Sequence, residues 1–370
     1  MPSEPADRSR ATLAEVASLA GVTVSTVSKV LNGRAGVSGE TRARIEALLQ
    51  DQDYRHRAAK RPAAPLLEVL CYEIDSPFAG EVLAGIEQAA RQRRVGMVLT
   101  SATERQQPYE EWVEDVVRRQ PVGVVLVAAS LDETDLQRLR SRSIPLVAID
   151  PAGDPVPGVP SVGSADWNGG FQATRHLIEL GHRRIGIITG PPDMMASTAR
   201  LSGYRAALDA AGLPVENELV RPGEFHHADG LAQGLHLLGL PDRPTAIFAS
   251  SDVYALGVYE AARSAGLTIP GDLSVVGYDD LHIARWAGPA MTTVRVPLAA
   301  MADQAVQLVL QLADEPELAF SRIDIDTSLV VRASTAAPAA SAAAPTAATA
   351  LAVAAAAAAA PAADAKVSRK

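Results

Sequence analysis

Cysteine and aromatic residues are scarce in this chain of 370 residues. The single cysteine, Cys71, permits neither an internal disulfide nor a cysteine-based metal cage, which fits a reducing compartment such as the cytoplasm. Aromatic residues make up only 4% of the chain, so alanine, valine and leucine must fill most of the core. A secreted domain held together by disulfides is therefore excluded.

Signals for export, membrane insertion and catalysis are also missing. The first ten residues carry both charge signs and no apolar run, and nothing before the last 38 residues is apolar for long enough to cross a membrane. The sequence has no dinucleotide-binding glycine motif, P-loop, nucleophile elbow or zinc-protease motif, and His226 and His227 lack a second cluster of ligands. We expect a cytoplasmic protein that is not an enzyme, contacts no membrane and needs no metal or cofactor.

Charge is divided unevenly along the chain. Residues 1–62 contain 10 Lys and Arg against 7 Asp and Glu, a balance of +3, whereas the other 308 residues contain 24 against 36, a balance of −12. A small basic N-terminal part on an acidic body is typical of a nucleic-acid-binding head attached to a larger domain.

The head, residues 9–54, is expected to be a small all-α domain. Residues 12–20, 24–32 and 38–52 each have apolar positions at three- and four-residue spacing. Gly21 lies in the tight turn between the first two segments, and Thr12 and Ser38 stand at helix N-cap positions. Val24 and Lys29 then project outward from the second helix, as in a helix-turn-helix, although an ordinary three-helix bundle would have the same spacing.

From Leu66 the pattern changes to short apolar strands that alternate with amphipathic helices. Seven strands are predicted, in residues 66–73, 95–102, 123–129, 145–150, 184–190, 245–251 and 272–279. Repeated βα units predict parallel sheets, and about 265 residues of them exceed one doubly wound domain. We predict a core, residues 66–332, of two α/β lobes with a ligand cleft between them, joined to the head by a basic linker, residues 55–65.

The last 38 residues, 333–370, are low in complexity. They contain 22 alanines and three prolines and have no amphipathic face to bury. A coiled coil would need apolar heptads, for which only Leu351 and Val353 are available. We predict a disordered tail.

Several longer motifs run in register along the chain. The head contains L-x-E-V-A-x-x-A-G-V-T-x-x-T-V-S-x-V-L-N, and the core contains HLIELGHRRIGIITG (176–190), RLSGYRAAL (200–208), RPTAIFASSDVYALGVYEAARSAGLTIPGDLSVVGYDD (243–280) and PAMTTV (289–294). Together they resemble the lactose-repressor/galactose-repressor (LacI/GalR) family of bacterial transcription regulators, over residues 11–332. The resemblance implies a helix-turn-helix head on a two-lobed core similar to periplasmic binding proteins.

The resemblance also implies which residues contact DNA. Val24, Ser25 and Lys29 would face base edges, because lysine donates to guanine, serine bonds either way and valine meets a thymine methyl group. Phosphates would be held by short polar residues of the head and by the basic linker: Thr12, Thr26, Ser28, Asn32, Ser38, Thr41, Arg55, Arg57, Lys60 and Arg61.

The linker departs from the family pattern. Where the family has a short hinge helix whose leucine enters the minor groove, this chain has Pro62 and Ala63. Proline interrupts a helix at that position, and alanine lacks the bulk to unstack a base step. We therefore expect the protein to bend its operator less than relatives that carry the leucine.

An effector site is expected between the lobes, at strand ends and adjoining loops. Carboxylates and an arginine would bond ligand hydroxyl groups, and aromatic side chains would cover its apolar face. Trp167 and Ser251 replace the asparagines that the family usually has, so the identity of the ligand does not carry over. The candidates are Phe78, Asp150, Trp167, Arg200, Phe225, Ser251 and Asp279.

The sequence thus predicts a homodimeric repressor of a palindromic operator, controlled by a small carbohydrate. Three other interpretations stay open: a solute-binding receptor-type module without a transcriptional role, a regulator with a non-sugar effector such as a nucleobase, and a doubly wound enzyme. The basic head and the lack of a phosphate-binding glycine loop argue against the first and the last.

Overall fold

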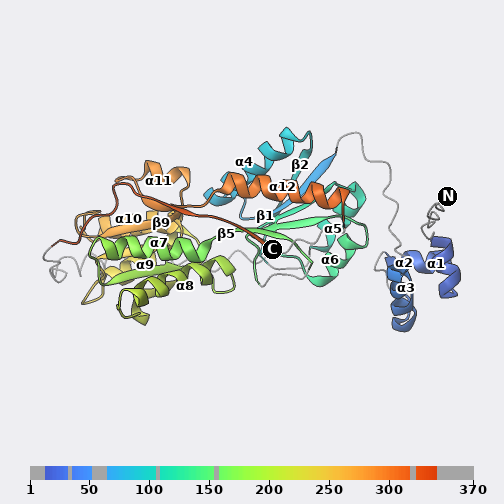
Figure 1. Ribbon diagram of the computed structural model, residues 1–370, viewed down its shortest axis with the longest axis horizontal. Helices are drawn as coiled ribbons and strands as arrows, with labels where there is room; N and C mark the ends of the chain where they lie inside the picture. The colour runs from blue at the N-terminus through green and yellow to red at the C-terminus, as the bar shows by residue number, and fades with distance from the viewer. Residues whose placement is uncertain are drawn as a thin grey trace, which may run out of the picture.

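The computed structural model describes residues 13–31, 36–51, 65–105, 109–153, 158–316 and 322–339. Three short helices form an N-terminal head, and the rest of the described chain forms two α/β lobes (Figure 1). The predicted fold class is confirmed. The linker residues Pro62 and Ala63, together with the four basic linker residues, lie outside the described chain.

The head has the helix-turn-helix geometry. It consists of α1 (Leu13–Ala20), α2 (Val24–Leu31) and α3 (Gly39–Asp51). Gly21 has a φ of +65° in the turn, which favours glycine, and α1 and α2 meet at 98°, within the range of DNA-binding helix pairs. In the described chain no single helix is long and apolar enough to cross a membrane; only this bent pair, counted together, reaches the required length and composition.

Side-chain caps fix where the second and third helices of the head begin. The backbone N–H of Thr26 donates to the Thr23 hydroxyl at 3.3 Å, and that of Thr41 donates to Ser38 at 3.3 Å. Ser38 was predicted as a cap and Thr23 was not. The faces that these helices turn inward form a small apolar core: Val16, Ala17, Ala20, Val27, Val30 and Ile45.

The early lobe comprises residues 66–164 together with α12 and β11. Its six-stranded sheet has the order β11-β5-β4-β3-β1-β2, and every pairing is parallel. The strands are β1 (Leu66–Tyr72), β2 (Gly96–Ala102), β3 (Gly123–Val127), β4 (Leu146–Ile149), β5 (Ser161–Ser164) and β11 (Arg322–Ile325). Val69 and Val125 pack against α4 (Pro77–Gln92) and α12 (Leu298–Asp314). Leu70 and Leu126 face α5 (Glu110–Arg119) and α6 (Glu133–Arg140) on the other side.

The late lobe repeats this plan over residues 166–295 and β12. Its sheet has the order β12-β10-β9-β8-β6-β7, in which only the edge strand β12 is antiparallel. The strands are β6 (Ile185–Thr189), β7 (Val220–Pro222), β8 (Ala246–Ala249), β9 (Ser274–Asp279), β10 (Thr292–Arg295) and β12 (Ser328–Val330). Helices α7 (Asp166–Glu179) and α8 (Met195–Ala210) cover one face, and α9 (His227–Leu238) and α10 (Asp252–Ser264) cover the other. The short α11 (His282–Trp286) and the 3-10 turn η1 (Asn217–Leu219) complete the lobe.

The chain passes between the lobes three times, between β5 and α7, between β10 and α12, and between β11 and β12. Two of these crossings are bonded to each other. The N–H of Ala165 donates to the carbonyl of Ile325 at 2.9 Å, and the Thr327 hydroxyl donates to the carbonyl of Ala165 at 3.3 Å. A change in the angle between the lobes must therefore act through these segments.

The core extends beyond the predicted boundary at residue 332. The buried Ser334 accepts from the N–H of Val275 at 2.9 Å, and its hydroxyl accepts from the N–H of Thr292 at 2.8 Å. The carbonyl of Ala336 lies 2.9 Å from Nε2 of His182, a residue expected to be structural. The start of the tail was thus predicted at least four residues too early, and residues 340–370 lie outside the described chain.

Candidate functional site

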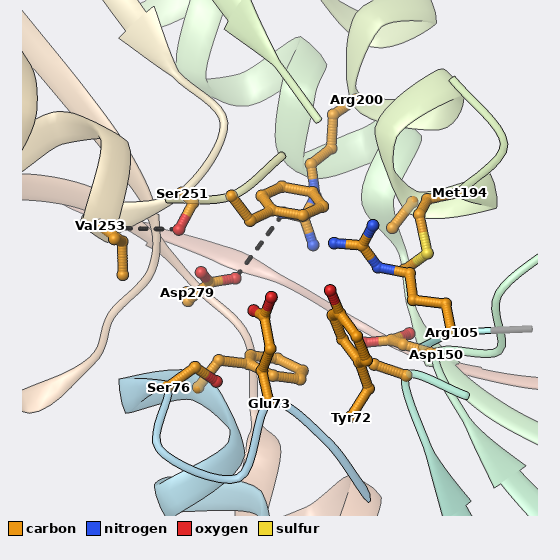
Figure 2. Close-up of a pocket in the computed structure, with 14 residues that line it drawn as sticks. Tyr72, Glu73, Ser76, Arg105, Asp150, Met194, Arg200, Ser251, Val253 and Asp279 are labelled. Carbon is orange, nitrogen blue, oxygen red and sulfur yellow. Dashed lines mark hydrogen bonds and ion pairs between the residues drawn. The ribbon is translucent and has the colours of Figure 1, made fainter. Parts of the chain in front are cut away.

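A cavity lies between the two lobes, at the ends of their strands (Figure 2). Its empty volume, open mouth included, is about 680 Å³, which is in the range of small-molecule sites. The structure brings six of the seven predicted effector residues together in its wall: Phe78, Asp150, Arg200, Phe225, Ser251 and Asp279.

The backbone is strained around this cavity. Five lining residues have positive φ angles: Glu73 (47°), Ala128 (49°), Asp150 (44°), Phe225 (67°) and Asp279 (107°). Non-glycine residues rarely adopt this region, at a cost of about 1–3 kcal/mol each. Such strain concentrated around one cavity is typical of a ligand site.

Arg200 is the buried cation of the cavity. It lies in the second turn of α8. Its Nε donates to Asp166 at 2.8 Å, its Nη1 donates to the carbonyl of Ser250 at 2.7 Å, and its guanidinium lies 3.8 Å from the centre of the Tyr278 ring. Burial alone would lower the pKa of Arg200, but the carboxylates of Asp166 and Asp279 outweigh it and raise the pKa, so the side chain is charged.

Asp166 connects Arg200 to a crossing between the lobes. Its Oδ1 accepts from Arg200 and also from the Ser164 hydroxyl at 3.0 Å and the Tyr278 hydroxyl at 3.1 Å. Ser164 ends β5 in the early lobe, whereas Asp166 begins α7 in the late lobe. Asp166 was not predicted as a site residue. Helices α7 and α8 pack so closely here that a Cβ on Gly170 would lie 2.3 Å from the Arg200 carbonyl oxygen, which explains glycine at that position.

Asp150 presents a carboxylate from the end of β4. The side chain is nearly buried, and its pKa is raised to about 7, mainly by this burial and also by the carboxylates Asp166 and Asp324. Arg200 and Arg322 lower the pKa and offset part of this rise. Asp150 is therefore poised to gain or lose a proton near neutral pH.

Asp279 faces the cavity from the end of β9. Its pKa is raised to about 7, mainly by burial and also by the carboxylates Asp166 and Asp150. Arg200 and a hydrogen bond from Ser251 lower the pKa and so offset part of this rise. Its Oδ1 is buried without a hydrogen-bond partner among the described residues and lies 3.8 Å from Nη1 of Arg200. An unsatisfied buried acceptor at a cavity wall is suited to a ligand donor.

Ser251 lines the cavity and also caps a helix. Its hydroxyl accepts from the N–H of Val253 at 3.2 Å and so caps α10 (Figure 2). The adjacent Asp252 is fully buried and accepts from the Thr293 hydroxyl at 2.6 Å and the N–H of Leu281 at 2.8 Å. Asp252 therefore fixes the loop after β9 and does not line the cavity.

Two of the three predicted aromatic residues line the cavity, and Trp167 does not. Phe225 stacks on Tyr254 with ring centres 5.5 Å apart, which leaves its other side to the cavity. Trp167, in the first turn of α7, is 48% exposed and stacks on Phe171, one turn further along, at 5.3 Å. The prediction that Trp167 faces the cleft is corrected, because the helix turns its side chain away.

Three polar contacts join the two lobes near the cavity. Arg105 donates to Glu224 at 3.0 Å and covers the Tyr72 ring at 4.6 Å. Nε2 of His226 lies 2.9 Å from Glu73, and the N–H and Nδ1 of His282 both lie 2.7 Å from Glu81. None of these pairs was predicted from the sequence, because each depends on how the lobes face each other. The contacts hold the lobes together around the cavity.

The two adjacent loop histidines contact different carboxylates. His226 contacts Glu73, and His227 lies 3.5 Å from Glu260. In the described part of the chain no group of three or more His, Cys, Asp or Glu side chains is arranged to hold a metal ion.

The predicted base-reading residues share the outer face of α2. Val24 is 45% exposed, Ser25 and Lys29 are exposed, and Val27 and Val30 point into the head core. Of the phosphate candidates, Thr26 and Ser28 are half-buried on α2, and Ser38 and Thr41 stand at the start of α3; Thr12, Asn32, Arg55, Arg57, Lys60 and Arg61 lie outside the described residues. The hydroxyl of Thr23 contacts those of Ser25 at 2.8 Å and Thr26 at 2.9 Å, so the start of α2 is pre-ordered.

Two families match the chain, one for each part. The family described as "Bacterial regulatory proteins, lacI family" matches residues 12–56, and the family described as "Periplasmic binding protein-like domain" matches residues 174–335. The ribose operon repressor of Escherichia coli (strain K12) is 32% identical over 335 residues, which cover 88% of this chain and 99% of that repressor.

Solved structures agree with both parts. A complex of the transcriptional regulator CelR with cellobiose has a TM-score of 0.67 and 33% identity, over 88% of this chain and 100% of that one. The lac repressor dimer bound to operator and the anti-inducer ONPF has a TM-score of 0.64 and 25% identity, over 89% of this chain and 100% of that one.

Proposed function

The chain belongs to the LacI family of bacterial regulatory proteins, and we propose that a small carbohydrate in the interlobe cavity sets its affinity for operator DNA. As a member of this family it is a DNA-binding transcription regulator. We propose further that it is a homodimeric repressor that acts in the cytoplasm, and that it has no enzymatic activity of its own. These proposals are supported by the geometry of the head, by the cavity and by the relatives, which are named as regulators or repressors.

The composition of the cavity wall carries the proposal. Two buried carboxylates, Asp150 and Asp279, and one buried guanidinium, Arg200, face a space that Phe78 and Phe225 also line. Hydroxyl groups of a sugar donate to carboxylates and accept from a guanidinium, while the C–H face of the ring packs against aromatic side chains. A ligand with this pattern would satisfy the free acceptor of Asp279.

Ligand binding would act on the angle between the lobes. Asp150 and Phe78 belong to the early lobe, and Arg200 and Asp279 belong to the late lobe, so a ligand that bonds both sides favours one lobe arrangement. Asp166 joins Arg200 to Ser164 across the β5–α7 crossing and so ties the site to the segment that must bend. The spacing of the two heads of a dimer would change with that arrangement, and operator affinity with it.

DNA recognition would rest on the outer face of α2. Lys29 would donate to guanine in the major groove, with Ser25 and Val24 beside it, while the hydroxyl groups near Ser38 contact phosphates. A single head reads few base pairs, so two heads on a palindrome are needed for specificity.

Operator binding with and without sugar tests the proposal. The full chain is titrated onto labelled DNA from its own upstream region, in the presence of pentoses, hexoses, disaccharides and a nucleobase. We expect a sequence-specific complex whose affinity changes with a carbohydrate and not with the nucleobase. Sequence-independent binding, or a response to the nucleobase alone, would contradict the proposal.

A further inference from the structure

The polar wall of the cavity is rich in carboxylates that no protein cation neutralises fully. Within the described residues the Asp150 side chain forms no ion pair, and Oδ1 of Asp279 has no hydrogen-bond partner and lies 3.8 Å from Arg200. The Glu73 carboxylate lies 2.9 Å from Nε2 of His226 and also bonds the Tyr72 side chain, and no lysine or arginine among the described residues pairs with it. All three carboxylates face the space that the effector would occupy.

The two arginines of the wall are already compensated by other carboxylates. Arg105 donates to Glu224 through Nη1 at 3.0 Å and to its carbonyl through Nη2 at 3.4 Å. Arg200 donates to Asp166 and to the carbonyl of Ser250, and its guanidinium lies against the Tyr278 ring. Neither offers a free positive charge to an incoming anion.

Three helices, α4, α8 and α10, begin at the cavity, and their positive ends do not offset its carboxylates. The side chain of Ser76 accepts from the N–H of Ala79 at 3.2 Å at the start of α4, and Ser251 accepts from the N–H of Val253 at the start of α10, whereas α8 begins at Met194 without a side-chain cap. A serine cap satisfies one N–H group and leaves the helix dipole in place. The three helix ends together amount to at most about one and a half positive charges, less than the charge of the three carboxylates.

From this balance we infer that the effector is an uncharged sugar, and that the site rejects sugars that carry a phosphate or a carboxylate. The inference rests on the proposed function and narrows its ligand class. A neutral ring donates hydroxyl hydrogens to Asp150 and Asp279 without adding charge. A phosphate or carboxylate group brings a like charge beside them in a nearly buried site, where screening by salt is weak.

Calorimetry on the full chain with chemically matched pairs tests the inference. The probes are ribose with ribose 5-phosphate, glucose with glucose 6-phosphate and with glucuronate, and cellobiose with cellobionate, at about pH 8, where both aspartates are ionised. The neutral member that binds best should bind at least about tenfold tighter than its anionic counterpart. Inorganic phosphate alone, which probes the start of α8, should not bind.

Two variants connect the discrimination to the carboxylates. Asp150→Asn and Asp279→Asn should narrow the ratio between neutral and anionic affinities, even where both affinities fall, because the ratio cancels a general loss of binding. The matched control is Asp209→Asn, which removes a charge from an exposed position of α8 outside the cavity and should leave the ratio unchanged.

The outcomes separate this inference from the proposed function. Equal or tighter binding of an anionic sugar, with the same sugar changing operator affinity, would overturn the inference and leave a sugar-controlled regulator. A ratio unchanged in both variants would also overturn it. If no sugar of either class binds or alters operator affinity, the proposed function fails together with the inference.

Discussion

Removal of the Asp166 carboxylate should destabilise the core and weaken effector binding together. Asp166 is 3% exposed, and its Oδ1 accepts from the Arg200 guanidinium, the Ser164 hydroxyl and the Tyr278 hydroxyl. In Asp166→Ala the Arg200 charge stays buried, with only Asp279 nearby at 3.8 Å.

The contacts set the expected magnitude. Breaking a buried ion pair by removing one partner costs about 3–5 kcal/mol, and each of the two lost hydroxyl bonds adds about 0.5–1.5 kcal/mol. The remaining attraction between Arg200 and Asp279 offsets part of this, so we expect about 4 kcal/mol for Asp166→Ala. Asp166→Asn keeps an acceptor but loses the charge, and we expect about 1.5–3 kcal/mol.

Urea unfolding and effector titration measure the two effects. The free energy of unfolding should fall in the order wild type, Asp166→Asn, Asp166→Ala, and sugar affinity should fall in the same order, because Arg200 loses the group that orients it. Asp209→Ala, at an exposed position of the same helix as Arg200, is the control and should change neither quantity. A loss below about 1 kcal/mol in Asp166→Ala, or unchanged sugar affinity, would refute the account of this network.

Three further predictions concern the DNA, pH and the linker. Lys29→Ala should lower operator affinity by about 1–3 kcal/mol and relax preference at one base pair per half-site in electrophoretic shifts on singly altered operators; a uniform loss at all positions would assign it to phosphate. Affinity for a neutral sugar should rise with pH up to about 7 and then level, because Asp150 and Asp279, with pKa values near 7, lose protons when hydroxyl groups donate to them. Calorimetry in two buffers should therefore detect proton release, and proton uptake would contradict this assignment. Replacing the four basic linker residues, Arg55, Arg57, Lys60 and Arg61, by glutamine should flatten the salt dependence of operator binding by several units of slope and leave sequence preference intact. A circular-permutation assay on the wild type should detect little bending of the operator. A sharp central kink, or a salt slope that the substitutions leave unchanged, would contradict this account and indicate that a hinge helix forms.

Most of the strands that could be predicted are buried apolar runs. The runs at β1 and β3 are almost entirely apolar, because helices cover both sides of a parallel sheet. The five missed strands, β5, β7, β10, β11 and β12, have three or four residues, and several alternate polar with apolar side chains. β11 and β12 follow crossings between the lobes, so no local pattern encodes their pairing, and β5, β7 and β10 are too short to show a clear period. The place of Ser334 in the folded core could not be predicted either, because its hydrogen bonds reach residues far away in the sequence.

The cavity residues at strand ends could be predicted because the ends of parallel strands meet at one edge of a sheet. Asp150 and Asp279 could be predicted from their places at strand ends, and Arg200 could be predicted from the family motif. The direction of the Trp167 side chain could not be predicted, because it depends on how the helix is rotated about its axis. Asp166 could not be predicted either, because in the sequence it is an ordinary acidic residue at a helix start.

Operator binding by the wild type and by Arg200→Ala, each with and without the sugar that binds best, tests the central claim most directly. Fluorescence anisotropy on a palindromic operator measures all four affinities in one experiment. The account predicts equal affinities for the two unliganded proteins, a change with sugar in the wild type, and no change in Arg200→Ala, because the head reads DNA and the cavity reads sugar. A sugar response that persists in Arg200→Ala, or a wild type whose operator affinity no sugar alters, would contradict it.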